Sequence, residues 1–184
     1  MPKSDYLPGD HFGFHSSVMI HRLANLAPNT LNIGKYTRVD AFVTITGNVS
    51  IGERVHVATG ACLLGGFGIV MEDGSGISPG AKIFTAGDDP SQDSLSNPAL
   101  VYRRMRKGPV YVGFFASIGA NSCVLPGASL GDESQIGCCS VVPAGMLVPP
   151  SEVWGGVPIH YIKRRVPIDR GAAMGHTPKL LTGA

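Results

Sequence analysis

The side chains best suited to moving a proton near neutral pH are the six histidines, and His56 stands out among them. His56 directly precedes the aliphatic Val57, so in an extended chain its imidazole points to the face opposite Val57. A general base of this kind works best when a carboxylate holds one ring nitrogen. Asp88 and Asp89 are the candidate carboxylates, and Asp88 is also a second candidate base.

Two plainer interpretations of these residues stay open. His56 could be a surface or interface histidine that only packs, or one that only orients a substrate. The aspartate pair stands just before Pro90 and could simply cap the start of a loop.

A six-residue period of aliphatic residues and methionine runs through most of the chain and must position these groups. A helix buries residues at a period near 3.6 and a hairpin sheet at a period of about 2, so neither explains it. Six residues suit a short strand plus a corner, with the period residue pointing inward. The period residues are Ile33, Val39, Ile45, Ile51, Val57, Leu63, Met71, Ile77, Ile83, Val112, Ile118, Val124, Leu130, Ile136, Val142 and Val148.

Three such walls close a triangular coil, and stacked coils pair like parallel strands about 4.8 Å apart. The sequence therefore predicts an all-β fold, a parallel β-helix of about five triangular coils. Small or β-branched residues such as Thr37, Ala61 and Ser122 come four positions after the period residue, where the walls converge. Glycine often follows the period residue directly, and we expect it to relieve the corner. These glycines are Gly34, Gly52, Gly113, Gly119, Gly131 and Gly137.

Counting coils places small residues above His56 on the same wall. The next coil brings Gly76 to that position and the following coil brings Ser117, which would leave a groove beside the imidazole. Between His56 and Gly76, the glycine-rich run 63–68 shifts the six-residue period by two residues. Such a slip indicates a bulge, or close approach of another backbone or a ligand.

The period also divides the chain. Residues 1–32 lack it, and their apolar residues are expected to form a short helix near 16–26 within an N-terminal cap. Residues 33–158 form the predicted β-helix domain, interrupted by a polar, turn-rich extended loop at 87–109. A loop of this length is usually functional. Residues 159–184 are the C-terminal tail, with a short strand or turn expected at 161–165.

Composition excludes several classes of protein. With 43% hydrophobic residues, 15% charged residues and a net charge of +2, the chain does not have the balance of a nucleic-acid or membrane-surface binder. No basic patch followed by an apolar run opens the sequence, so we expect no secretory signal, no membrane span and a cytoplasmic protein. The four cysteines lack zinc-type spacing and are expected to be free thiols, and no metal site is predicted.

Three stretches resemble the hexapeptide acyltransferases. They are the repeated Ile-Gly-x-x-x-x pattern, the stretch from Ile118 to Ala128 and the closing Gly-Gly-Val-Pro-Ile-His-Tyr-Ile-Lys-Arg at 155–164. The resemblance covers about residues 31–165 and implies a left-handed β-helix that uses acyl-coenzyme A and forms a homotrimer. The stretch 55–58, the glycine-rich run and the Asp-Asp loop opening are similar to a subgroup of polysaccharide-biosynthesis acetyltransferases.

The resemblance also implies site residues. In the family the extended loop reaches a neighbouring subunit and often opens with a histidine, where this chain has Asp88. The pantetheine arm of coenzyme A is bonded by backbone groups at positions matching Ala120 and Cys138, and phosphates meet basic residues matching Lys163, with Arg164 or Arg165 beside it. Apart from the resemblance, we expect Ser117 and Gly119 to bind the coenzyme, with a backbone N–H of one of them as the oxyanion donor.

We therefore expect an acetyltransferase with acetyl-coenzyme A as cosubstrate. The acceptor would be a hydroxyl or amino group of a sugar, free or linked to a nucleotide or lipid, in surface polysaccharide or O-antigen assembly. One alternative is a catalytically degenerate hexapeptide trimer that serves as a scaffold or binding protein. Another is a γ-carbonic-anhydrase-type zinc enzyme, which would need three histidines from two walls, whereas only His56 lies within the repeats.

Overall fold

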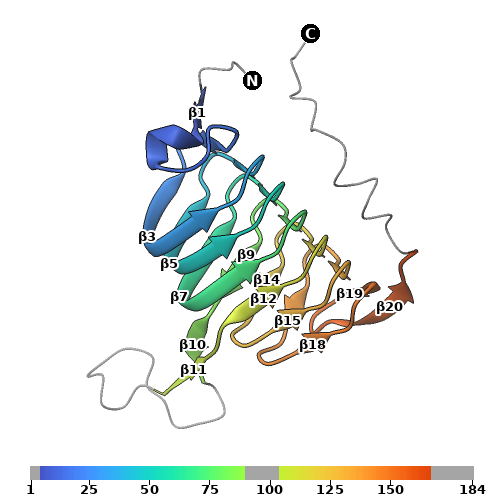
Figure 1. The fold of residues 1–184 in the computed structure, drawn as a ribbon. Helices are drawn as coiled ribbons and strands as arrows, with labels where there is room; N and C mark the ends of the chain where they lie inside the picture. The colour runs from blue at the N-terminus through green and yellow to red at the C-terminus, as the bar shows by residue number, and fades with distance from the viewer. Residues whose placement is uncertain (1–4, 90–103, 167–184) are drawn as a thin grey trace.

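The computed structural model describes residues 5–89 and 104–166. They form the predicted all-β, left-handed parallel β-helix, a three-walled stack of about 6 turns (Figure 1). Within these two ranges the only helical segment is a short 3-10 turn, η2 (Gly9–Phe12). No helix in the described part of the chain is long and apolar enough to cross a membrane.

One wall, here called wall A, runs the length of the stack and carries His56. Its parallel strands are β2 (Met19–His21), β4 (Arg38–Val39), β6 (His56–Val57), β8 (Gly76–Ile77), β13 (Ser117–Ile118), β16 (Gln135–Ile136) and β19 (Glu152–Gly155). Strand β1 (Tyr6–Pro8) pairs antiparallel with β2 at the N-terminal edge, and β20 (His160–Arg164) pairs antiparallel with β19 at the other. Both edges of wall A are therefore covered by an antiparallel strand.

The other two walls share one sheet because three long strands turn the corner between them. These are β3 (Asn25–Ile33), β5 (Thr44–Ile51) and β7 (Cys62–Met71). The remaining strands are β9 (Lys82–Phe84), β14 (Cys123–Val124) and β17 (Val141–Val142) on one wall, and β12 (Val110–Val112), β15 (Ser129–Leu130) and β18 (Leu147–Val148) on the other. Strands β10 (Ala86–Asp88) and β11 (Met105–Lys107) form an antiparallel ribbon that projects from the stack at the base of the extended loop (Figure 1).

The six-residue period fills the interior as predicted. Every period residue is buried, and none is more than 8% exposed. The small residues four positions later are buried as well, and their hydroxyls connect coils: Thr37 Oγ1 donates to Gly52 O at 2.8 Å and accepts from Val55 N–H at 3.0 Å. Burial of this column supplies the main driving force for stacking.

The reason expected for the glycines after the period residue was wrong. The left-handed backbone lies three residues after the period residue, as at Tyr36, Arg54 and Asn121 (φ between 56 and 62°). Gly119 has no such φ; instead, a Cβ there would lie 2.5 Å from the backbone N of Cys138. The same close approach holds at Gly34, Gly52, Gly113 and Gly131, so these glycines let adjacent coils approach one another; Gly137, with 3.6 Å of room, is the exception.

The helix expected near 16–26 was also wrong, because this segment already belongs to the stack. Ile20 pairs with Val39 and Leu26 with Ile45 in parallel register. Relative to β5, strand β3 has one extra residue between Pro28 and Thr30. The six-residue period is therefore displaced by one before this point, and the first coil is not recognised from the sequence. That coil accounts for about 6 turns in place of about five. The domain boundaries after residues 32 and 158 stay a prediction.

The predicted slip at 63–68 is confirmed as a bulge in β7. One residue lies between Gly47 and Val49 in β5, whereas three lie between their partners Gly65 and Ile69 in β7. The inserted Phe67 contacts the ribbon of the extended loop, with Lys107 Nζ 5.1 Å from its ring centroid. The bulge therefore supports the base of the extended loop.

Candidate active site

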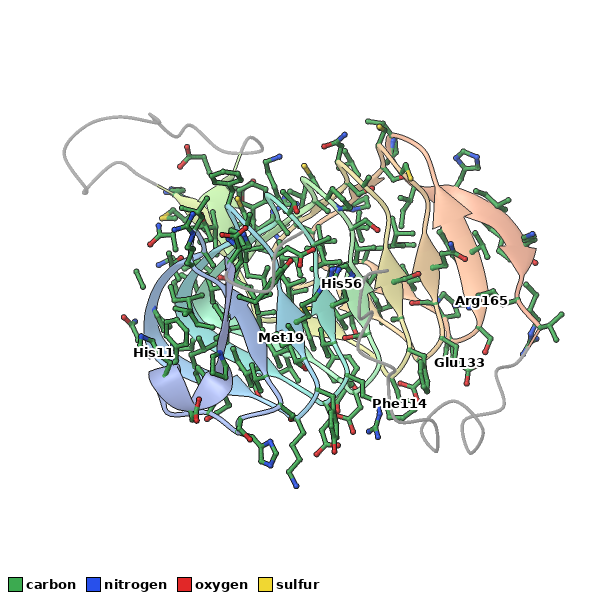
Figure 2. The ribbon with its side chains drawn as sticks, turned by 90° about the horizontal axis from the view of Figure 1, so that it is seen from above. His11, Met19, His56, Phe114, Glu133 and Arg165 are labelled. Carbon is green, nitrogen blue, oxygen red and sulfur yellow. The ribbon has the colours of Figure 1, made fainter. Side chains whose placement is uncertain are left out.

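His56 points outward from the middle of wall A, with a side chain that is 46% exposed (Figure 2). Arg38 is its partner one coil towards the N-terminus, and Gly76 its partner one coil towards the C-terminus. Ser117 follows Gly76 in the next coil. The predicted column of small residues above His56 is therefore confirmed.

A buried carboxylate holds the imidazole. His56 Nε2 lies 2.8 Å from Oδ2 of Asp40, whose side chain is only 10% exposed. The Tyr6 hydroxyl donates to the other oxygen, Oδ1, at 2.6 Å, and Arg38 Nε forms an ion pair with the same oxygen at 2.9 Å. Asp40 thus collects contacts from three strands, β1, β4 and β6.

The surroundings keep Asp40 charged. Burial raises its pKa, but hydrogen bonds from His56 and Tyr6 and the charge of Arg38 outweigh burial and lower the pKa to about 2. Burial and the hydrogen bond to this carboxylate raise the pKa of Tyr6 to about 12. At neutral pH the site therefore contains a carboxylate, a guanidinium and a neutral phenol beside the imidazole.

Sequence reasoning missed Asp40, Arg38 and Tyr6. A signal for two of them was present, because subtracting one coil of 18 residues from His56 reaches Arg38, and Asp40 lies two residues further. Nothing in the period marks Tyr6, which reaches the site only because β1 folds back along β2.

The predicted aspartates lie at the base of the extended loop. Asp88 ends β10, is exposed and pairs with Met105, while Asp89 Oδ1 lies 3.3 Å from Arg106 Nη2. The carboxylate that holds His56 within this chain is Asp40 instead. An approach of Asp88 or Asp89 to His56 of an adjacent subunit stays a prediction.

The expected oxyanion donors are already occupied. The Ser117 N–H donates to Ser134 O and the Gly119 N–H to Ile136 O, both at 2.9 Å. These bonds belong to the ladder between coils, so neither group can serve an oxyanion without breaking it. A contact of Ser117 and Gly119 with coenzyme A stays a prediction.

Ala120 and Cys138 present a different pair of backbone groups. They occupy equivalent corner positions in successive coils, and Cys139 N–H donates to Ala120 O at 2.8 Å. Among residues 5–89 and 104–166, no carbonyl accepts the N–H of Ala120 or of Cys138. Two amide donors one coil apart can therefore bind an extended ligand that carries amide carbonyls.

Small side chains cover wall A between His56 and these donors. Besides Gly76 and Ser117, the positions that follow the period residues on this wall are small in four successive coils. We call this surface the bare stripe; it consists of Gly76, Ser78, Ser117, Gly119 and Gly137, whereas Ala58 below them is buried. Gln135 is the larger side chain beside it.

Basic side chains lie at the C-terminal end of wall A. Lys163 and Arg164 are exposed on β20, opposite Val153 and Glu152. Arg165 is labelled at that end of Figure 2, and its Nη1 donates a hydrogen bond to Glu133 O at 2.9 Å. Five strand spacings separate β6 from β20, which is roughly 24 Å at 4.8 Å each.

The described residues contain no cluster of three or more side chains suited to hold a metal ion. All four cysteines are free thiols, and Cys138 and Cys139 are exposed.

The chain resembles known sugar-modifying enzymes, although no protein-family model matches it. It is 29% identical over 119 residues to a dTDP-4-amino-4,6-dideoxy-D-glucose acyltransferase of Escherichia coli, covering 62% of each chain. It is 22% identical over 134 residues to a galactoside O-acetyltransferase of Escherichia coli, covering 73% of this chain and 63% of the relative. The chain thus spans a little under two thirds of the length of these curated relatives.

Solved structures give a longer correspondence. A variant of AntD, an N-acyltransferase from Bacillus cereus crystallised with dTDP and coenzyme A, is 30% identical to this chain. The similarity covers 85% of this chain and 88% of AntD, with a TM-score of 0.80.

Proposed function

The chain belongs to the hexapeptide-repeat family of sugar acyltransferases, and on this premise we propose that it transfers an acetyl group from acetyl-coenzyme A to a nucleotide-linked sugar. An amino group is the preferred acceptor, because the E. coli relative is named for a dTDP-linked amino sugar and AntD is an N-acyltransferase crystallised with that sugar. The product would serve surface polysaccharide or O-antigen assembly. Four free thiols favour a cytoplasmic location.

The observation that carries this proposal is the line from His56 along the bare stripe to β20. Acyl transfer needs a base for the acceptor and a surface that holds the thioester beside it. The acceptor nitrogen attacks the thioester carbonyl, a C–N bond forms and the C–S bond breaks. His56 accepts the proton that the nitrogen loses and passes it to the departing coenzyme A thiolate.

The dimensions of coenzyme A agree with this line. The arm from sulfur to the first phosphorus contains about 13 bonds and spans about 16 Å when extended. A lysine side chain adds about 6 Å, so sulfur near His56 is compatible with phosphates near Lys163 and Arg164 across roughly 24 Å. In this pose the N–H groups of Ala120 and Cys138 donate to the carbonyls of the pantetheine arm.

The relatives also support a role for the loop-base aspartate. AntD was crystallised with substitutions at a serine and at an aspartate ten residues further along. Ser78 and Asp88 have the same separation here, and Ser78 lies on the bare stripe. We propose that both residues line the acceptor site, with Asp88 from an adjacent subunit.

A homotrimer is part of the proposal. Val70, Tyr111 and Leu147 point outward from one column of a second wall and are 40%, 38% and 71% exposed, and Ser129 lies between Tyr111 and Leu147 in that column. Three exposed apolar side chains on one face suit contact with another copy of the chain. Light scattering should give the mass of a trimer, and an active monomer would contradict this part of the proposal.

The direct test combines binding and turnover. Calorimetry should show binding of acetyl-coenzyme A, and release of its thiol should depend on a dTDP-linked amino sugar. His56→Ala should lower kcat about 10²- to 10⁴-fold, whereas His15→Ala should leave it unchanged because, within the described residues, that exposed side chain bonds to Ser17 alone. Absence of coenzyme A binding would favour the scaffold alternative, and near-normal turnover of the His56 variant would remove it as base.

A further inference from the structure

Two side chains compete for one ring nitrogen of His56. Nε2 lies 2.8 Å from Asp40 Oδ2, an acceptor, and also 2.8 Å from Arg38 Nη2, a donor. A ring nitrogen that carries a proton can only donate, and one that lacks it can only accept. Only one of these contacts is therefore a hydrogen bond in the neutral imidazole.

Of the two contacts, the one between Nε2 and the Asp40 carboxylate is the hydrogen bond. If Nε2 lacked its proton, its lone pair would face the charged Oδ2 at 2.8 Å, and this buried oxygen would lose its shortest donor. The remaining contact of Oδ2, from Arg38 Nη2, is longer at 3.4 Å. If Nε2 carries the proton, it donates to a carboxylate, and this charge-assisted bond is among the stronger kinds.

When Nε2 of His56 carries the proton, Arg38 Nη2 has no hydrogen bond to the ring, but this costs little free energy. Its side chain is 43% exposed, so water can solvate Nη2, and its Nε keeps the ion pair with Oδ1 at 2.9 Å. Leaving a buried acceptor without a donor costs more than leaving an exposed donor to water. The other oxygen, Oδ1, is already held by the Tyr6 hydroxyl at 2.6 Å, so Asp40 cannot turn away.

We infer that Asp40 is a positioning residue that fixes His56 in the tautomer with the proton on Nε2, which leaves Nδ1 as the nitrogen that accepts the proton of the acceptor group. Within the described residues, Nδ1 makes no hydrogen bond, so it is open to a substrate. The catalytic part of this inference rests on the proposed function, whereas the tautomer does not.

The proton balance follows from this assignment. The acceptor amine or hydroxyl loses its proton to Nδ1 as it attacks the thioester, and the ring becomes an imidazolium whose charge faces Asp40. The thiolate of coenzyme A then takes the proton from Nδ1. Asp40 stays ionised throughout and only orients and stabilises the ring.

Loss of the carboxylate charge should reverse the tautomer. In Asp40→Asn the amide no longer attracts the Nε2 proton as an anion does, while Arg38 Nη2 remains 2.8 Å away as a ready donor. Nε2 then accepts from Arg38, and the proton moves to Nδ1. The base nitrogen would be blocked even though the ring keeps its place.

The test is the tautomer itself, read from long-range ¹H–¹⁵N spectra of protein labelled with ¹⁵N-histidine at a pH where the ring is neutral. His56→Gln assigns the signal. The wild-type protein should show Nε2 protonated and Nδ1 unprotonated, Asp40→Asn should show the opposite or a mixture, and Arg38→Met should keep the wild-type pattern. Asp10→Asn, an exposed control in η2, should change nothing.

Turnover provides the second readout. Asp40→Asn should lower kcat about 10²-fold with little change in KM for acetyl-coenzyme A. A wild-type spectrum with the proton on Nδ1 would overturn the inference, even if no variant folds. So would an Asp40→Asn variant with normal tautomer and normal turnover. Failure of coenzyme A binding would instead defeat the proposed function and leave the tautomer to be measured.

Discussion

Gly76 lies directly above His56 in the next coil, and a Cβ added to Gly76 would meet nothing closer than the His56 carbonyl oxygen at 3.8 Å. Its φ lies outside the left-handed region, so neither backbone strain nor packing requires glycine here. The missing side chain instead keeps the surface of wall A low beside the imidazole. This is the space in which the proposed function places the thioester.

Filling that space should impair activity without affecting folding. Gly76→Leu would place a side chain between His56 and Ser117, so we expect kcat/KM for acetyl-coenzyme A to fall at least ~10-fold, because the thioester loses its alignment. The melting temperature should stay within ~2 °C of the wild type. Gly76→Ala is the matched control and should be much milder. Equal activity of the leucine variant would mean that the thioester lies elsewhere.

The backbone donors can be tested with proline. Pro79 occupies the corner position of Ala120 and Cys138 in the coil below, so a proline fits this corner. Ala120→Pro or Cys138→Pro would remove an N–H that the protein's own ladder does not use. Loss of one hydrogen bond of about 0.5–1.5 kcal/mol should weaken binding of coenzyme A about 2- to 12-fold, measured by calorimetry.

The side chain of Cys138 provides the control for the proline variants. Cys138→Ser keeps the N–H and should bind coenzyme A as the wild type does. If the serine variant weakens binding while the proline variants do not, the thiol and not the backbone makes the contact. Circular dichroism should show the same β content in all three variants.

The sequence predicted the fold because one physical requirement repeats in it. Residues such as Val57, Ile77 and Ile118 must fill the same narrow interior in every coil, so their spacing reveals the coil. The prediction failed where the coil length changes, since the extra residue between Pro28 and Thr30 moves Ile20 and Leu26 off the period. It also gave the wrong role to Gly119, because close approach of two backbones leaves no trace in a hydrophobic pattern.

The site was harder to predict for a related reason. His56, Gly76 and Ser117 share one column and could be found by counting coils upward. Asp40 lies one coil towards the N-terminus and two residues beyond Arg38, the partner of His56. Counting coils towards the C-terminus from His56 therefore does not find it. Tyr6 arrives through a strand outside the repeat, so only the folded chain brings its hydroxyl to Asp40.

The ionisation of Asp40 predicts a pH-dependent stability. Its pKa falls from 3.8 to about 2 on folding, which is worth about 2 kcal/mol when the group is charged. Because the folded pKa is the lower one, this stability is present above about pH 4 and is lost as the pH falls towards 2. Asp40→Asn should therefore be less stable than the wild type at pH 7, and the difference should shrink between pH 4 and 2. Urea unfolding across this range measures it, and a constant difference would show that Asp40 is not held as described.

Two glycines at equivalent positions should respond differently to the same methyl group. A Cβ at Gly119 would lie 2.5 Å from Cys138 N and 2.5 Å from Gly137 C, both backbone atoms that can move only if the coils separate. A Cβ at Gly137, one coil further, would meet nothing closer than Trp154 O at 3.6 Å, an ordinary contact. Neither residue has a left-handed φ, so alanine adds no backbone strain at either position.

Gly119→Ala should therefore cost about 2–3 kcal/mol by overpacking, which for a chain of this size lowers the melting temperature by roughly 5–10 °C. Gly137→Ala should stay within about 1 kcal/mol of the wild type. Calorimetric melting of the two variants, at one protein concentration because the assembly affects the melting temperature, makes the comparison. Equal melting temperatures would show that the coils separate at little cost, and the glycines after the period residues would then need another explanation.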